Sequence, residues 1–151
     1  MKTIGKSLKI LDLSAGNRAI WFNKNHPLCT YLDKRAEVNP TFVCDTNEEI
    51  PGSGYNLICW DPPHMNCGPK SNMSKAYGYH TTEQILETLR KTGCNVYEKS
   101  AEGALMALKW NTHDISLKRV FELLPKWEPL FGHLTKDGPR SQTYWIMLRR
   151  L

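Results

Sequence analysis

The stretch 8–16 reads LKILDLSAG, an apolar run that ends at an acid and a glycine. A short apolar run without alternation is typical of a strand that is buried on both faces. We therefore predict a buried strand over Leu8–Leu13 and a loop over Ser14–Gly16. Sheets built from such strands bind their ligands at the carboxyl ends of the strands.

Similar runs recur along the chain, separated by prolines, glycines and asparagines. They predict further strands at 29–33, 41–45, 55–60, 103–110, 129–134 and 144–148. Helices are expected to begin at the capping residues Thr81 and Asp114, and 17–24 is compatible with a helix. The alternation predicts an α/β fold, a doubly wound, mostly parallel seven-stranded sheet with helices on both faces and a C-terminal antiparallel hairpin.

Size and composition exclude several classes of protein. The length of 151 residues predicts a single domain over 1–151. The composition, with 40% hydrophobic and 23% charged residues, excludes a disordered or fibrous chain. The chain has no apolar run long enough to cross a bilayer, and its first residues lack the apolar core of a signal peptide. We expect a cytoplasmic protein that does not contact a membrane. The five cysteines are an odd number without regular spacing, which favours reduced thiols.

The net charge is +5, from 20 basic and 15 acidic residues. A basic protein is suited to a polyanionic partner such as nucleic acid. The charge is spread over the chain rather than gathered in a tail, so it supports such a partner without establishing it.

Acids stand at or near the ends of successive predicted strands: Asp12, Asp33, Asp45 and Asp61. One such acid is readily explained as a turn or cap residue, but parallel strands would bring all of them to one edge of the sheet. The loop after the first strand has a single glycine where a dinucleotide site has three, and the chain has no phosphate-binding P-loop. A ligand with a ribose and no phosphate fits better. Asp33 would accept hydrogen bonds from the ribose hydroxyls, and Asp45 from an adenine amino group.

Four segments resemble one protein family. They are Ala15–Phe22 (AGNRAIWF), Tyr31–Asp33 (YLD), Trp60–His64 (WDPPH) and Leu108–Trp110 (LKW). In order and spacing they resemble the class I S-adenosylmethionine (SAM)-dependent methyltransferases, and among these the small phage and prophage enzymes related to the N6-adenine amino-methyltransferases. Those enzymes have a glycine loop of the form C-G-x-R-x-x-W-F, and Ala15 replaces its cysteine here. The resemblance spans residues 8–150, but the target-recognition domain of sequence-specific DNA methyltransferases is missing.

The resemblance implies a site for each substrate. Catalysis would fall to Asp61, Pro62, Pro63 and His64. The resemblance and the strand ends assign SAM binding to Asp12, Ser14, Ala15, Gly16, Asn17, Arg18, Asp33, Asp45 and Thr46. Asp61 and the carbonyl of Pro62 would accept both N–H groups of an exocyclic amine, and His64 would take the position where related enzymes stack an aromatic ring on the base. A base in a duplex would first have to be flipped out.

Other residues keep two interpretations. Arg18 would bind the SAM carboxylate or form a surface salt bridge, and Lys109 would act in the site or lie solvated at a strand end. The loop 64–80, with Lys70, Lys75, Tyr77 and Tyr79, would contact nucleic acid or serve as a plain flexible lid. Zinc binding by Cys59, His64, Cys67 and His80 is disfavoured because their spacing matches no standard site. We expect no metal.

The expected function is methyl transfer from SAM to an exocyclic amine of a nucleic-acid base, with adenine N6 in DNA preferred over RNA. Without a recognition domain, low sequence specificity, a homodimer or a specificity-giving partner subunit is expected. Two alternatives remain: a non-catalytic methyltransferase-like protein that binds nucleic acid or protein, and a methyltransferase of another small-molecule or protein amine.

Overall fold

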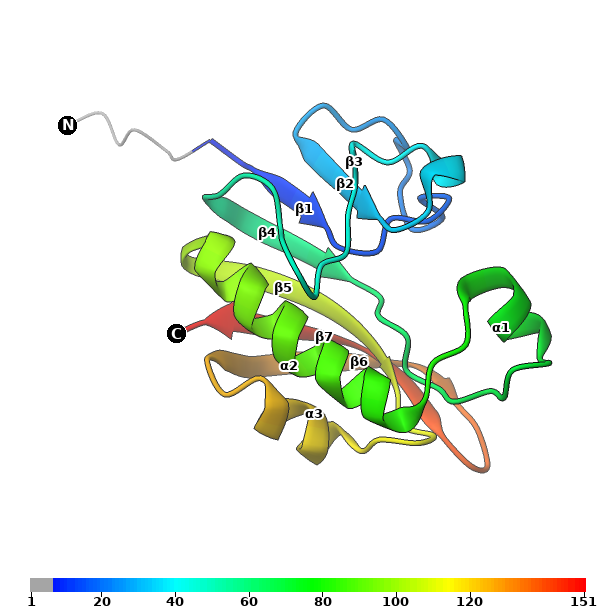
Figure 1. Ribbon diagram of the computed structural model, residues 1–151. Coiled ribbons are helices and arrows are strands. Elements are labelled where there is room, and N and C mark those ends of the chain that lie inside the picture. Colours follow the sequence, from blue (N-terminus) through cyan, green and yellow to red (C-terminus); the bar gives the residue numbers. More distant parts are fainter. Residues whose placement is uncertain (1–6) are drawn as a thin grey trace.

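Seven strands form one mixed sheet in a computed structural model that describes residues 7–151 (Figure 1). The strands are β1 (Ile10–Asp12), β2 (Cys29–Asp33), β3 (Phe42–Val43), β4 (Tyr55–Trp60), β5 (Ser100–Asn111), β6 (Trp127–Asp137) and β7 (Gln142–Arg150). Their order is β3-β2-β1-β4-β5-β7-β6. The strands β1 to β5 are parallel, and β7 runs antiparallel to both β5 and β6. This confirms the predicted fold class, a mostly parallel sheet with a C-terminal antiparallel hairpin.

The strand order reverses between β1 and β4. From β1 the chain moves outward to β2 and β3, and it then returns to β4 on the other side of β1. Loops that leave neighbouring strands in opposite directions open a crevice at the carboxyl ends of those strands. The fold therefore places the ends of β1 and β4, with Asp12 and Asp61, beside one crevice.

The helices are α1 (Asn72–Tyr77), α2 (Thr82–Lys99) and α3 (Leu117–Leu123), with a short 3₁₀ turn at Ala36–Val38. The predicted capping box of α2 is present, because Thr81 and Gln84 exchange side chain–backbone hydrogen bonds. The cap predicted for α3 is wrong. Ser116 caps that helix, whereas the carboxylate of Asp114 accepts a hydrogen bond from the backbone N–H of Asn66.

The helix compatible with 17–24 is absent, and the described residues 13–41 contain no α-helix at all. Gly16 and Arg18 both have positive φ angles, of 48° and 55°, which a right-handed helix excludes. The side chain of Arg18 instead donates to the backbone oxygen of Lys24, and Trp21 donates its indole N–H to Asp12. The connections from β1 to β3 are therefore loops and one 3₁₀ turn.

The helices α2 and α3 pack on the same face of the sheet (Figure 1). Gly93 of α2 lies against Leu124 at the end of α3, and its carbonyl accepts the indole N–H of Trp127. On the other face, Leu105 and Phe131 are exposed. The expected cover of helices on both faces is therefore wrong for residues 7–151, because the loops after β1 and β2 take the place of the helices.

Within the described residues 7–151, no helix combines the length and the apolar character that a bilayer crossing requires. Residues 1–6, part of the stretch expected to lack a signal peptide, lie outside the described residues.

Candidate active site

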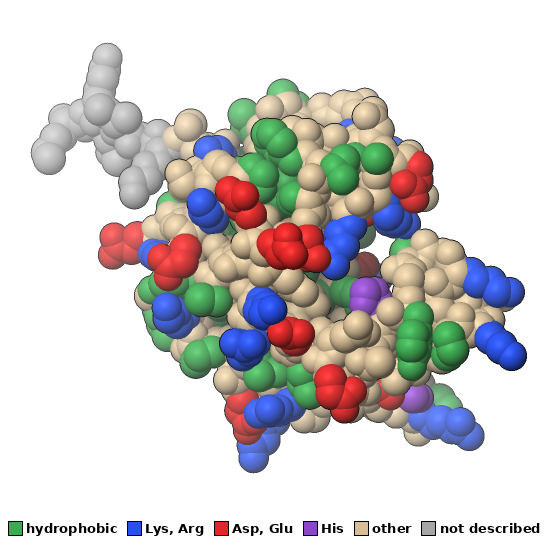
Figure 2. All heavy atoms as spheres, viewed as in Figure 1, with side chains coloured by type: hydrophobic (Ala, Val, Ile, Leu, Met, Phe, Trp, Pro, Cys, Tyr) green, Lys and Arg blue, Asp and Glu red, His purple; other side chains and the backbone are tan. Residues whose placement is uncertain are grey.

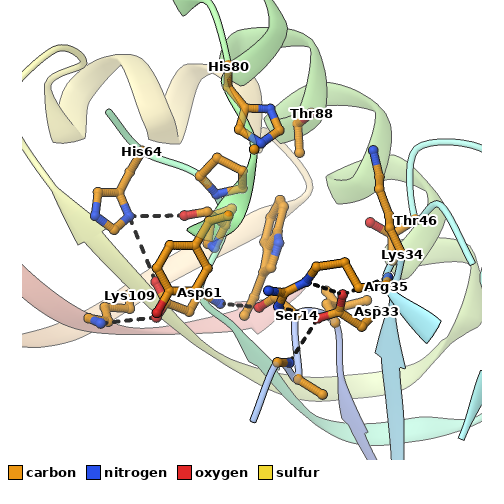
Figure 3. A pocket seen from close by; sticks show the side chains of 18 of the residues that line it. Ser14, Asp33, Lys34, Arg35, Thr46, Asp61, His64, His80, Thr88 and Lys109 are labelled. Carbon is orange, nitrogen blue, oxygen red and sulfur yellow. Dashed lines mark hydrogen bonds and ion pairs between the residues drawn. The ribbon is translucent and has the colours of Figure 1, made fainter. Parts of the chain in front are cut away.

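A cavity of about 690 Å³ lies at the carboxyl ends of the parallel strands (Figure 3). Its walls come from the ends of β1, β2, β4 and β5 and from α1 and α2, and its lining includes Asp12, Asp33, Asp45 and Asp61. The structure thus brings together the four acids that the sequence placed at strand ends. A cavity of this size suits a small ligand or cofactor.

Asp12 is buried at the end of β1, with 2% of the residue exposed. One carboxylate oxygen accepts the indole N–H of Trp21 at 2.7 Å, and the other accepts the backbone N–H of Ser14 at 3.1 Å. Burial raises the pKa of Asp12 although both hydrogen bonds act to lower it. Asp12 therefore fixes the loop after β1 at the floor of the cavity.

Asp33 ends β2 and is held by Arg35. The guanidinium Nε lies 3.0 Å from Oδ1 and Nη2 lies 3.2 Å from Oδ2, while the backbone N–H of Gly16 donates to Oδ2 at 2.9 Å. Burial alone would raise the pKa of Asp33, but the hydrogen bonds from Arg35 and Gly16 outweigh it and the pKa is lowered. The glycine loop and the end of β2 are thus joined through one ionised carboxylate.

Asp45 follows β3 and carries a similar partner. Its Oδ2 lies 2.9 Å from the ammonium of Lys34, and its Oδ1 accepts the backbone N–H of Asn47. Burial raises the pKa of Asp45, but these two partners outweigh burial and lower it. Thr46 lies beside Asp45 in the cavity wall, and its hydroxyl is 3.0 Å from that of Thr92 in α2.

Asp61 follows β4 directly, and Lys109 of β5 reaches it from the neighbouring strand (Figure 3). The ammonium of Lys109 lies 3.0 Å from Oδ2 of Asp61. The backbone N–H of Asp61 donates to the hydroxyl of Ser14 at 2.9 Å, which ties the ends of β1 and β4 together. Ser14 therefore positions Asp61, a role that the sequence did not indicate.

His64 lines the cavity next to Asp61, and its stacking on a target base stays a prediction. Its Nδ1 lies 3.0 Å from the carbonyl oxygen of Pro62 and 3.8 Å from Oδ1 of Asp61, and its ring packs edge-on against Trp110. Burial lowers the pKa of His64, while the nearby Asp61 acts to raise it. A neutral ring donating from Nδ1 to Pro62 satisfies this geometry. His64 thus braces the backbone after Asp61.

Of the other residues assigned to cofactor binding, Ala15, Gly16 and Asn17 line the cavity with Asp12 and Ser14, whereas Arg18 does not. The guanidinium of Arg18 donates to Lys24, Asn25 and Asn39 and lies 4.0 Å from the ring centre of Tyr31. It fastens the loop after β1 to the turn after β2. Among residues 7–151 Arg18 has no acidic partner, so the alternative of a surface salt bridge is wrong, whereas binding of the SAM carboxylate by Arg18 stays a prediction.

The sequence missed several lining residues. Lys34 and Arg35 directly follow Asp33, so their place after a strand end was a usable signal. Thr88 and His80 enter the wall because α2 begins beside the cavity. The predicted loop 64–80 also contains a helix, α1, because the side chain of Ser71 caps its first turn.

The described residues contain no group of three or more His, Cys, Asp or Glu side chains placed to hold a metal ion.

Solved structures with the same fold are class I SAM-dependent methyltransferases. A TehB-like SAM-dependent methyltransferase from Corynebacterium glutamicum has a TM-score of 0.65 at 13% identity, over 95% of this chain and 80% of that one. The N-methyltransferase NodS from Bradyrhizobium japonicum, in complex with S-adenosyl-L-homocysteine, has a TM-score of 0.60 at 11% identity, over 95% of this chain and 78% of that one. TrmN from Thermus thermophilus has a TM-score of 0.62 at 16% identity, over 95% of this chain and 44% of that one. No family model matches the chain, and no curated protein matches it in sequence. The chain therefore has the class I methyltransferase fold.

Proposed function

We propose that this protein is a SAM-dependent methyltransferase that acts on an exocyclic amine of a nucleic-acid base, with adenine N6 in DNA as the preferred target. One observation carries the proposal: Asp33, Asp45 and Asp61 line a single cavity at the carboxyl ends of β2, β3 and β4. A nucleoside-like methyl donor and a substrate amine both need hydrogen-bond acceptors, and the three carboxylates lie in one cavity.

The chemistry of the cavity fits SAM. Asp33 is the acceptor for ribose hydroxyls, and it already accepts the N–H of Gly16. Asp45 is the acceptor for the adenine amino group, and the loop Ser14–Asn17 lines the part of the cavity between β1 and β4. When bound, SAM supplies an electrophilic methyl group on its sulfonium. In this conformation Arg35 forms an ion pair with Asp33, and Lys34 forms one with Asp45. The charges in this part of the cavity are therefore balanced, which suits the uncharged adenosine moiety of SAM.

The chain's own residues hold the amine. Oδ1 of Asp61 is not used by Lys109, whose ammonium contacts Oδ2, so it is left to accept one amine N–H. The carbonyl of Pro62 accepts the other N–H through its second lone pair, since His64 uses only one. Pro62 and Pro63 have fixed φ angles, which keep this carbonyl in place. The two acceptors orient the nitrogen lone pair and reduce its delocalisation into the ring, an effect of positioning.

Tritiated-methyl transfer from SAM to pools of DNA, RNA and protein tests the proposal. The expected result is label in nucleic acid, greatest in adenine-containing DNA. Label in protein alone would identify another amine as the substrate. If calorimetric titration detects no SAM binding, a non-catalytic binding protein remains.

A further inference from the structure

The segment that follows Asp61 carries positive charge without acids. Residues 62–82 contain no Asp or Glu, while Lys70 and Lys75 are exposed. Part of the segment forms α1, whose Met73, Ser74 and Tyr77 line the cavity beside Asp61. In Figure 2 the molecule is hollowed beside the lobe at the right, which has Lys or Arg side chains at its outer end. One wall of the cavity mouth is therefore basic on its outer side.

Exposed aromatic rings stand on the same wall. Tyr77 is 62% exposed and Tyr79 is 42% exposed. The ring centre of Tyr77 lies 5.6 Å from the guanidinium carbon of Arg35, which keeps the ring at the mouth of the cavity. A basic surface with exposed aromatic rings is suited to unstacked bases and their phosphates.

The hairpin of β6 and β7 ends at the same edge of the sheet. Asn111, the last residue of β5, pairs with Thr143, and the hairpin turn begins one residue beyond, at the pair Asp137–Gln142. Lys109 of β5 lines the cavity only two residues from this end. The turn therefore projects past the edge that holds Asp61 (Figure 1). It exposes Lys136 and Arg140 there.

Within residues 7–151, none of Lys70, Lys75, Lys136 and Arg140 forms a salt bridge. On the helical face, Lys91 and Arg119 do, with Glu87 and Glu122. Cations without acidic partners remain available for phosphates.

We propose that a single strand of nucleic acid lies across this edge, with its phosphates on Lys70 and Lys75 to one side and on Lys136 and Arg140 to the other. This rests on the proposed function and names its substrate as single-stranded. Neighbouring bases stack on Tyr77 or Tyr79, and the target base enters the cavity toward Asp61. A duplex is disfavoured because its target base would have to be flipped out.

Fluorescence anisotropy with a labelled adenine-containing oligonucleotide of about 12 nucleotides tests this. The double variants Lys70→Ala/Lys75→Ala and Lys136→Ala/Arg140→Ala should each weaken binding about tenfold at low salt. Each should also reduce the salt slope by about 1.4, or 0.7 for each lost phosphate contact. Tyr77→Ala should weaken binding about tenfold.

The matched control is Lys99→Ala/Lys126→Ala, which removes the same charge at the opposite edge of the sheet, and it should bind as the unaltered protein does. The same oligonucleotide as a duplex should bind more weakly. Equal or tighter duplex binding would overturn the proposal, and so would an equal loss in the control variant. Because the assay needs no methyl transfer, binding without methylation would contradict the proposed function alone. Methylation unaffected by the four substitutions would contradict this inference alone.

Discussion

Lys109 and Asp61 join neighbouring parallel strands by an ion pair of 3.0 Å at the mouth of the cavity. The pair fixes the carboxylate through Oδ2 and leaves Oδ1 within 3.8 Å of the ring of His64. A cation in this position limits the rotation of the Asp61 carboxylate. We therefore assign Lys109 a positioning role toward Asp61, the carboxylate proposed to hold the amine.

Lys109→Met should lower kcat by up to about 100-fold, because a misplaced group in an active site costs rate on that scale. SAM affinity should change little, because Lys109 contacts none of the acids assigned to the cofactor. Lys109→Arg should restore part of the rate by keeping the charge. Steady-state methyl transfer with each variant measures this, and an unchanged kcat for Lys109→Met would contradict the role.

Arg35→Met should tighten SAM binding by about two- to fivefold. Arg35 occupies both oxygens of Asp33, so the ribose hydroxyls must displace it, and a partly exposed ion pair of this kind contributes up to about 1 kcal/mol. Calorimetric titration measures the change, with Arg119→Met on α3 as the control. Weaker binding would show that the guanidinium contacts the ligand.

The same ion pair makes folding sensitive to acid. The pKa of Asp33 in the folded protein is lowered from its ordinary value of 3.8, so the ionised carboxylate stabilises the folded state above about pH 3.8. This stabilisation is lost as the pH falls through the folded-state pKa. Below pH 4, the free energy of unfolding of Arg35→Met should therefore fall less steeply with decreasing pH than that of the unaltered protein.

Arg18→Ala should lower stability by about 1–2 kcal/mol, since the side chain donates three hydrogen bonds that hold two loops. In a chain of this size the melting temperature should fall by roughly 2–8 °C. SAM affinity should stay within about twofold. Thermal denaturation and titration of one preparation separate these effects. A large loss of affinity without loss of stability would support the predicted binding of the SAM carboxylate by Arg18.

Cys29 and Cys59 should resist alkylation in the folded protein at pH 8. Burial raises the pKa of each thiol from 9.0 to about 12, and the thiolate is the reactive form. Exposed Cys94 should react first. Peptide mass spectrometry after iodoacetamide treatment checks the order. Because the folded protein holds these thiols protonated, its free energy of unfolding should decrease as the pH rises from 9 toward 12. Early labelling of Cys59 would contradict the raised pKa of its thiol.

Much of the fold could be predicted because buried strands have strong local signals. The predicted ranges of β2 and β4 match the structure, since turns and prolines bound both runs. The helix expected at 17–24 failed because tertiary contacts decide that segment. Its residues are held by the Arg18 side chain and by the bond from Trp21 to Asp12, and neither can be read from local propensity.

The site could be predicted only in part. Parallel strands bring their final residues to one edge, so Asp33 and Asp61 were found from sequence. Their cationic partners were harder, because the pairing of Lys109 with Asp61 depends on β5 lying beside β4. The contacts of His64 with Pro62 and Trp110 likewise depend on tertiary packing.

The most direct test compares the unaltered protein with Asp61→Asn on a single-stranded adenine-containing oligonucleotide, with products read as nucleosides by mass spectrometry. The unaltered protein should form N6-methyladenine nucleoside. Asp61→Asn should bind SAM within about twofold of the unaltered protein and yet form the product at least about 100-fold more slowly. Formation of that product by Asp61→Asn at the unaltered rate would contradict the account.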